Sequence, residues 1–65
     1  MMKVIEVMEE SSQSWEDATQ NAVREAGKTV KHIKSAWVKD MSTIIKDNEV
    51  AKFRVTLKIS FEVER

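Results

Sequence analysis

The chain has 65 residues, of which 11 are basic and 11 acidic, and it contains no cysteine, no proline and one histidine. This length allows one domain, residues 1–65, and a domain of this size buries only about 60% of the surface that its unfolded chain exposes. The composition excludes disulfides and thiolate metal sites. The balanced charge argues against a nucleic-acid partner, and no apolar run is long enough to span a membrane. We therefore expect a soluble, cytoplasmic protein that is stabilised by oligomerisation.

The first two elements are predicted by an apolar run and by a helix-capping signal. KVIEVMEE, from Lys3, is apolar and β-branched, so it predicts a strand that SSQS ends. Ser14 is a good N-cap, and Asp17 follows it at the spacing of a capping box. Helical spacing then predicts a helix from Trp15 to about His32, with its cations near the C-terminal end of the helix dipole. The apolar face of this helix comprises Trp15, Ala18, Ala22, Val23, Ala26, Val30 and Ile33.

The rest of the chain predicts a hairpin of two strands around Asp47-Asn48-Glu49. The second strand alternates without exception, which predicts one buried and one polar face. Its apolar positions are Ala51, Phe53, Val55, Leu57, Ile59, Phe61 and Val63, and its polar positions run from Lys52 to Glu64. This strand spans roughly 50 Å and the helix only about 27 Å. The uncovered part, with Phe53 or Phe61 on it, must therefore bend around the helix or meet another subunit, and we expect an obligate oligomer.

Two segments resemble the dodecin family over nearly the whole chain. SWEDATQNAVREAGKTVKHI resembles the dodecin helix, and FRVTLKISFEVE resembles the final strand of that family. The resemblance implies an α+β fold of β-α-β-β order, in which a three-stranded antiparallel sheet curls around one helix. It also implies a hollow homododecamer that binds flavins, such as riboflavin or FMN, at subunit interfaces. The resemblance further implies a protein that stores or buffers flavin and is not an enzyme.

The resemblance implies candidate ligand positions on the second and third strands. Family members stack the flavin ring on a tryptophan that begins the second strand, and they hydrogen-bond its polar edge through a glutamine in the last strand. Those positions hold Ser35 and Arg54 in this chain. Trp37 lies two residues further on, so its side chain leaves the same face of the strand, roughly 6.6 Å away. Arginine has no hydrogen-bond acceptor, so it cannot reproduce the edge of donor and acceptor that glutamine presents. The candidate cofactor-binding residues are Ser35, Trp37 and Arg54.

Each candidate also has a structural interpretation. Trp15 is expected to anchor the core or an interface, and Trp37 is either a subunit contact or a stacking platform. Arg54 is either a ligand-binding group or a partner in a cross-strand ion pair. No catalytic residues and no metal site are predicted, because no nucleophile motif surrounds His32 and the acidic residues fit no calcium loop.

Two functions remain open at this point. The first is a flavin store. The second is a dodecin-like shell that binds calcium or a nucleotide-type cofactor such as coenzyme A instead of flavin, or that is purely structural.

Overall fold

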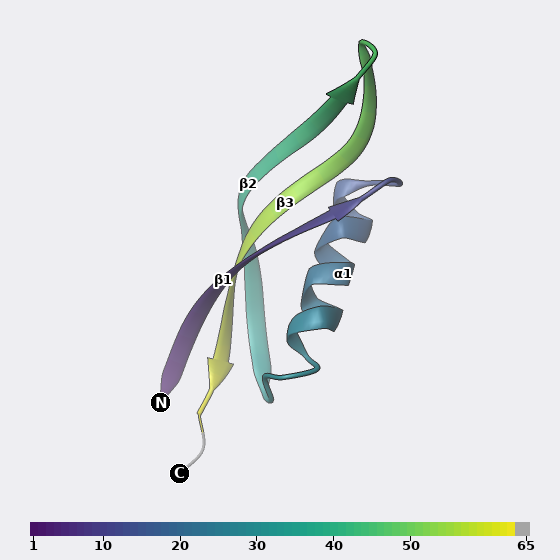
Figure 1. Cartoon of the computed structure of the whole chain (residues 1–65). Coiled ribbons are helices and arrows are strands. Elements are labelled where there is room, and N and C mark those ends of the chain that lie inside the picture. Colours follow the sequence, from purple (N-terminus) through teal and green to yellow (C-terminus); the bar gives the residue numbers. More distant parts are fainter. Residues whose placement is uncertain (64–65) are drawn as a thin grey trace.

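Three strands and one helix form the part of the chain that the structure, a computed structural model, describes, namely residues 1–63. In chain order they are β1 (Met2–Ser11), α1 (Trp15–Ala26), β2 (Ile33–Lys46) and β3 (Glu49–Glu62). The strands form one antiparallel sheet in the order β1-β3-β2. Figure 1 shows α1 lying along one face of this twisted sheet. The predicted α+β fold of β-α-β-β order is confirmed.

Helix α1 begins where the capping signal predicts and ends earlier than expected. The Ser14 hydroxyl accepts a hydrogen bond from the Asp17 backbone N–H at 2.9 Å, which satisfies one of the unpaired donors of the first turn. At the other end, the N–H groups of Lys28 and Thr29 bond to carbonyls only three residues back, so the helix tightens and stops at Ala26.

The expectation that the helix continues to about His32 was therefore wrong. Val30 and Ile33 keep the apolar spacing of the helix, but Ile33 packs against the core as the first residue of β2. His32 itself has a left-handed backbone, with φ of 62°, which no continuing helix permits. Lys28, Lys31 and His32 consequently lie beyond the helix and do not form its last turn.

The predicted turn at Asp47-Asn48 joins β2 directly to β3. Both residues have positive φ, at 53° and 63°. A two-residue hairpin loop of this kind matches the right-handed twist of its strands, and aspartate and asparagine tolerate the conformation better than most residues. The sequence signal is confirmed, although Glu49 already belongs to β3.

The core lies where the middle of β3 meets the alanines of α1. Val55, Leu57 and Ile59 are fully buried, and they face Ala18, Ala22 and Ala26 across the interface. Methyl side chains on α1 allow the helix to approach the sheet closely. The predicted buried face of β3 is confirmed only for this middle portion, because Ala51 is exposed and Phe53 and Phe61 are half-buried. Glu64, the last position of the predicted alternation, lies outside the described residues.

Trp15 ties the start of α1 to the hairpin. Its indole Nε1 donates a hydrogen bond to the carbonyl oxygen of Ser42 at 3.1 Å. The rings of Trp15 and Phe53 pack edge to face, with their centroids 5.0 Å apart. The expected role of Trp15 as a core anchor is confirmed, and Phe53 is occupied by this contact instead of belonging to the uncovered surface.

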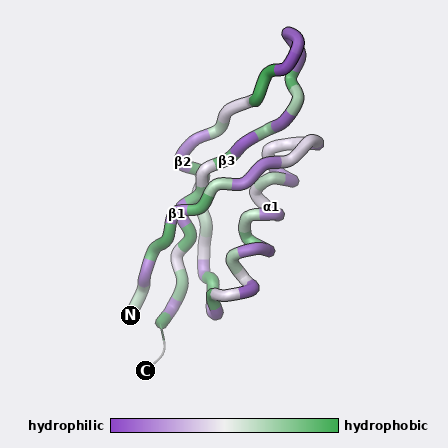
Figure 2. The backbone as a smooth tube through the Cα atoms, in the orientation of Figure 1, coloured by the Kyte–Doolittle hydropathy of each residue, from purple (hydrophilic) through white to green (hydrophobic). Residues whose placement is uncertain are grey.

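The β2–β3 hairpin projects well beyond the helix. The described chain measures 50 × 19 × 13 Å, whereas the 12 residues of α1 cover only about 18 Å. Figure 1 shows the hairpin turn at one end of the molecule, past the end of α1. Figure 2 shows hydrophobic positions on this projecting part. Five large apolar residues of the hairpin are more than 40% exposed, namely Trp37, Val38, Met41, Ile45 and Val50.

Candidate functional site

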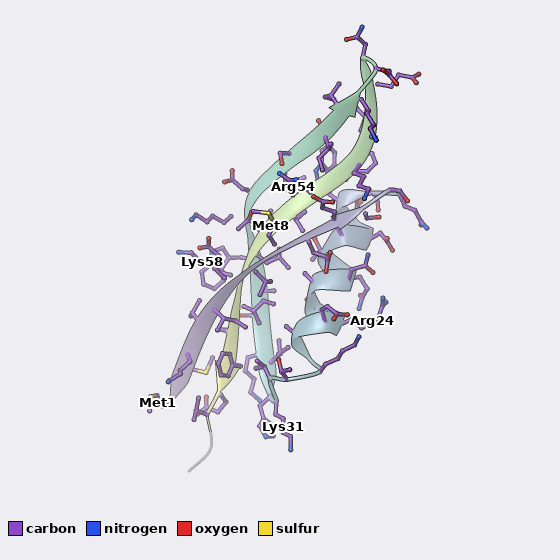
Figure 3. All side chains as sticks on the ribbon, viewed as in Figure 1. Met1, Met8, Arg24, Lys31, Arg54 and Lys58 are labelled. Atoms are coloured by element: carbon purple, nitrogen blue, oxygen red, sulfur yellow. The ribbon has the colours of Figure 1, made fainter. Side chains whose placement is uncertain are left out.

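The candidate ligand residues all lie on the face of the sheet that is turned away from α1, which we call the outer face. Leu57 and Ile59 face the helix, so the residues that alternate with them on β3 point outward. Ser35 is the register partner of Ser60 and Trp37 is the partner of Lys58, without a bulge between them. The expectation that both side chains share one face is therefore confirmed. Met8, Arg54 and Lys58, which are labelled in Figure 3, also belong to this face.

Trp37 is a half-exposed aromatic group in the middle of β2. Its relative exposure is 48%, which is high for a residue whose indole is largely apolar. In the register of the sheet, Trp37 of β2 lies beside Lys58 of β3, which in turn lies beside Glu6 of β1. Glu6 accepts an ion-paired hydrogen bond from Lys39 at 3.3 Å, and Lys39 sits at a bulge of β2. Trp37 thus offers an open aromatic surface beside charged side chains.

Ser35 has its hydroxyl occupied by a neighbour on β3. The Oγ atoms of Ser35 and Ser60 are 2.6 Å apart, so one donates a hydrogen bond to the other. Ser60 is buried, whereas Ser35 remains exposed. This pair places two small side chains beside Trp37 on the outer face.

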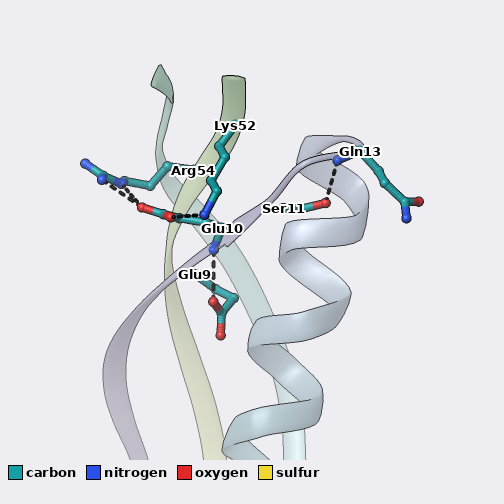
Figure 4. Close-up of polar contacts among 6 residues, drawn as sticks. All are labelled: Glu9, Glu10, Ser11, Gln13, Lys52 and Arg54. Carbon is teal, nitrogen blue, oxygen red and sulfur yellow. Dashed lines mark hydrogen bonds and ion pairs between the residues drawn. The ribbon is translucent and has the colours of Figure 1, made fainter. Parts of the chain in front are cut away.

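Arg54 is held by a partner that the sequence analysis did not identify. Its Nε and Nη2 atoms both donate to Oε2 of Glu10, at 3.0 and 2.7 Å (Figure 4). Lys52 approaches the other oxygen, Oε1, at 3.8 Å, which is an ion-pair distance and too long for a hydrogen bond. The hydrogen bond from Arg54 lowers the pKa of the Glu10 carboxyl below its ordinary value, and the charges of Arg54 and Lys52 act in the same direction.

The interpretation of Arg54 as a cross-strand ion-pair partner is confirmed, and Glu10 is the residue that sequence reasoning missed. Glu10 is the register partner of Arg54 across β1 and β3. The sequence shows Glu10 only as one of two acids at the end of an apolar run. The number of residues between the strands does not reveal their register, so no signal in the sequence joined this acid to Arg54.

The structure does not bring the three predicted residues into one pocket. Lys58, the register partner of Trp37, lies four positions from Arg54 on β3, which is about 13 Å along the strand. Ser35 lies further away in the same direction. A flat ligand that contacts both Trp37 and Arg54 must therefore lie between them or lie against residues of two subunits.

Two hollows lie at opposite ends of the sheet. One has a volume of about 270 Å³ and is polar; it is lined by Glu10, Ser11, Ser12, Asp17, Asn21 and Lys52. The other has a volume of about 290 Å³ and lies where the loop after α1 meets the end of β3; it is lined by Thr29, Val30, Lys31, His32, Phe61, Glu62 and Val63. Neither hollow contains Trp37 or Arg54, although Glu10 borders the first.

Metal-binding and membrane-spanning features are absent from the part of the chain that is described. Among residues 1–63, no three histidine, cysteine, aspartate or glutamate side chains gather closely enough to hold a metal ion. No helix within the same range has the length and apolar character needed to cross a membrane.

This small protein combines a β-α-β-β fold with an exposed aromatic on the outer face of its sheet. A sequence model of the Dodecin family matches residues 1–64. The chain therefore belongs to the dodecin family, as the resemblance predicted. No curated protein sequence matches the chain.

Solved dodecin structures match the fold over its full length. An arginine-to-alanine variant of the Thermus thermophilus dodecin is 29% identical, with a TM-score of 0.95 and coverage of 100% of this chain and 97% of the other. The dodecin of Streptomyces coelicolor is 31% identical, with a TM-score of 0.96 and coverage of 100% and 93%. Calcium dodecin of Mycobacterium tuberculosis, described as a calcium-chelating antigen with a novel calcium-binding site, is 30% identical, with a TM-score of 0.87 and coverage of 98% and 91%.

Proposed function

We propose that this protein is a non-enzymatic flavin store or buffer that works as a hollow homododecamer in the cytoplasm. The observation that carries the proposal is the open indole of Trp37 on the outer face, 48% exposed. A flat ring such as that of riboflavin or FMN gains contact area and a favourable offset stack on an exposed aromatic surface. Arg54 supplies hydrogen-bond donors on the same face. Membership in the dodecin family supports the same ligand class.

Exposed apolar surface supports the assembly part of this proposal. Val4, Met8 and Trp37 on the outer face, together with Ile45 and Val50 near the hairpin turn, are each about half-exposed or more. Large apolar groups in this number are uncommon on the surface of a small monomer, and they mark surfaces that another protein covers. Covering the outer face with a neighbouring copy would enclose a ligand that rests on Trp37.

Titration of the protein into riboflavin tests the proposal. Stacking on an indole quenches flavin emission, so we expect emission to fall at micromolar protein. The variant Trp37→Ala should weaken binding by about tenfold, the upper range for an aromatic pair. Val38→Ala is the matched control, because Val38 is an adjacent exposed residue that points to the opposite face. Unchanged flavin emission with the wild-type protein would contradict the proposal.

Calcium binding is the second candidate, and the similarity to calcium dodecin favours it. Residues 1–63 hold no group of three possible ligand side chains within one chain, so a calcium site would need carboxylates from several subunits. Calorimetric titration with calcium separates the two functions. Heat of binding with calcium, together with no quenching of riboflavin, would replace the flavin proposal with this one.

A further inference from the structure

The ion pair between Glu10 and Arg54 leaves hydrogen-bonding capacity of both kinds on the outer face. Arginine carries five N–H donors and no acceptor, and an ionised carboxylate only accepts. Glu10 takes two of these donors through Oε2. Its other oxygen, Oε1, faces Lys52 at 3.8 Å and so keeps its acceptor sites. Both side chains are partly exposed, at 32% for Glu10 and 38% for Arg54.

We propose that Glu10 and Arg54 together bind the imide edge of the flavin ring, with Glu10 as the acceptor that determines specificity. This inference rests on the proposed flavin function. The pyrimidine part of a flavin presents an N3–H donor between two carbonyl acceptors. Arg54 donates to a carbonyl, and Oε1 of Glu10 accepts from N3–H. Neither residue provides both kinds of group alone, whereas the pair does.

The geometry of the pair keeps both groups in place before a ligand arrives. Two bonds to one carboxylate oxygen fix the orientation of the guanidinium plane of Arg54 (Figure 4). The pKa of Glu10 is lowered by this contact, so the carboxylate remains an acceptor at neutral and mildly acidic pH. Adjacent positions on β1 and β3 hold the two backbones in register.

The pair and Trp37 contact different parts of the same ligand. Trp37 offers a surface for the face of a ring, and the pair offers groups for its edge. Their rows lie about 13 Å apart on the same face of the sheet. A ligand that meets both contacts therefore lies between them or against residues of two subunits.

A comparison of two ligands on the wild-type protein tests the inference. Riboflavin and its N3-methyl derivative have the same ring face, but methylation removes the N3–H donor. We expect the wild-type protein to bind riboflavin at least about tenfold more tightly than the methylated ligand, as for loss of a hydrogen bond to a charged group. The variant Glu10→Ala should bind riboflavin more weakly and no longer distinguish the two ligands. Glu10→Gln, which keeps an amide acceptor, should retain part of the discrimination.

The control and the outcomes separate this inference from the proposed function. Glu25→Gln removes the charge from a similar exposed ion pair, with Lys28 at 2.9 Å, and should change neither affinity. Equal binding of both ligands by the wild-type protein overturns the role of Glu10 and leaves flavin binding standing. Failure of the wild-type protein to bind riboflavin overturns both. If Glu10→Ala does not assemble, the two-ligand comparison on the wild-type protein still decides.

Discussion

At the scale of single residues, the contacts of Arg54 account for a difficulty that the sequence alone raises. An arginine at the glutamine position of the family has no acceptor for a ligand edge. In the folded chain, Glu10 places a carboxylate oxygen 2.7 Å from Nη2 of Arg54 and so brings an acceptor to the same place. A substitution at one strand is thus interpretable only with the side chain opposite it on the neighbouring strand.

The Glu10–Arg54 contact predicts a measurable pKa. Arg54 holds the pKa of Glu10 below its ordinary value of 4.5. A carboxyl group whose pKa falls on folding stabilises the fold above the unfolded value, and this contribution is lost as pH falls through the folded pKa. Stability should therefore decline below about pH 4.5 in part through this pair. A carbon-detected NMR titration of Glu10 should give a value below 4.5.

The matched variant for this titration is Arg54→Gln, which keeps a polar side chain and removes the charge. The pKa of Glu10 should rise in this variant, because the charged hydrogen-bond donor of Arg54, which is the main cause of the lowering, is gone. An identical titration curve in both proteins would show that the ion pair does not form in solution.

At the scale of elements, local sequence patterns predicted the start of the helix and the hairpin turn better than the end of the helix. The cap at Ser14 and the turn at Asp47-Asn48 depend on nearby backbone geometry, and both were correct. The predicted end of α1 was wrong because Ile33 fits helical spacing and yet packs, partly buried, against the core as the first residue of a strand. Predicting that Ser35 and Trp37 share one face of the sheet required only strand parity. The contact between Glu10 and Arg54 required the β1–β3 register, which tertiary packing decides.

Close packing between α1 and the sheet predicts that adding a leucine to α1 is destabilising at a buried position and nearly neutral at an exposed one. Ala22 is 3% exposed and faces the buried residues of β3. Ala22→Leu adds volume to a filled interface, so the free energy of unfolding should fall by about 1–3 kcal/mol. Gln20→Leu, at an exposed position of the same helix, should change it by less than about 0.5 kcal/mol. Urea denaturation measures both, and equal effects would contradict the packing described.

At the scale of the whole molecule, the dimensions of the chain favour assembly. The described chain extends over 50 Å, and α1 covers only about 18 Å of it. The hairpin beyond α1 therefore carries apolar side chains that no element of the same chain covers, including Ile45 at 56% and Val50 at 52% exposure. The single helix of one chain is too short to cover these side chains, whereas neighbouring copies can cover them.

Sedimentation velocity tests this assembly, with an expected particle of twelve times the 7.5 kDa of one chain. Ile45→Lys places a charge on the apolar surface near the hairpin turn, where burial without a partner is unfavourable. We expect this variant to dissociate into smaller species, with a dissociation constant at least about tenfold higher than that of the wild-type particle. Glu49→Lys is the control, because it changes charge near the same turn at an exposed position that is already polar. A wild-type monomer would refute the assembly, and an intact Ile45→Lys particle would show that the hairpin lies outside the subunit contacts.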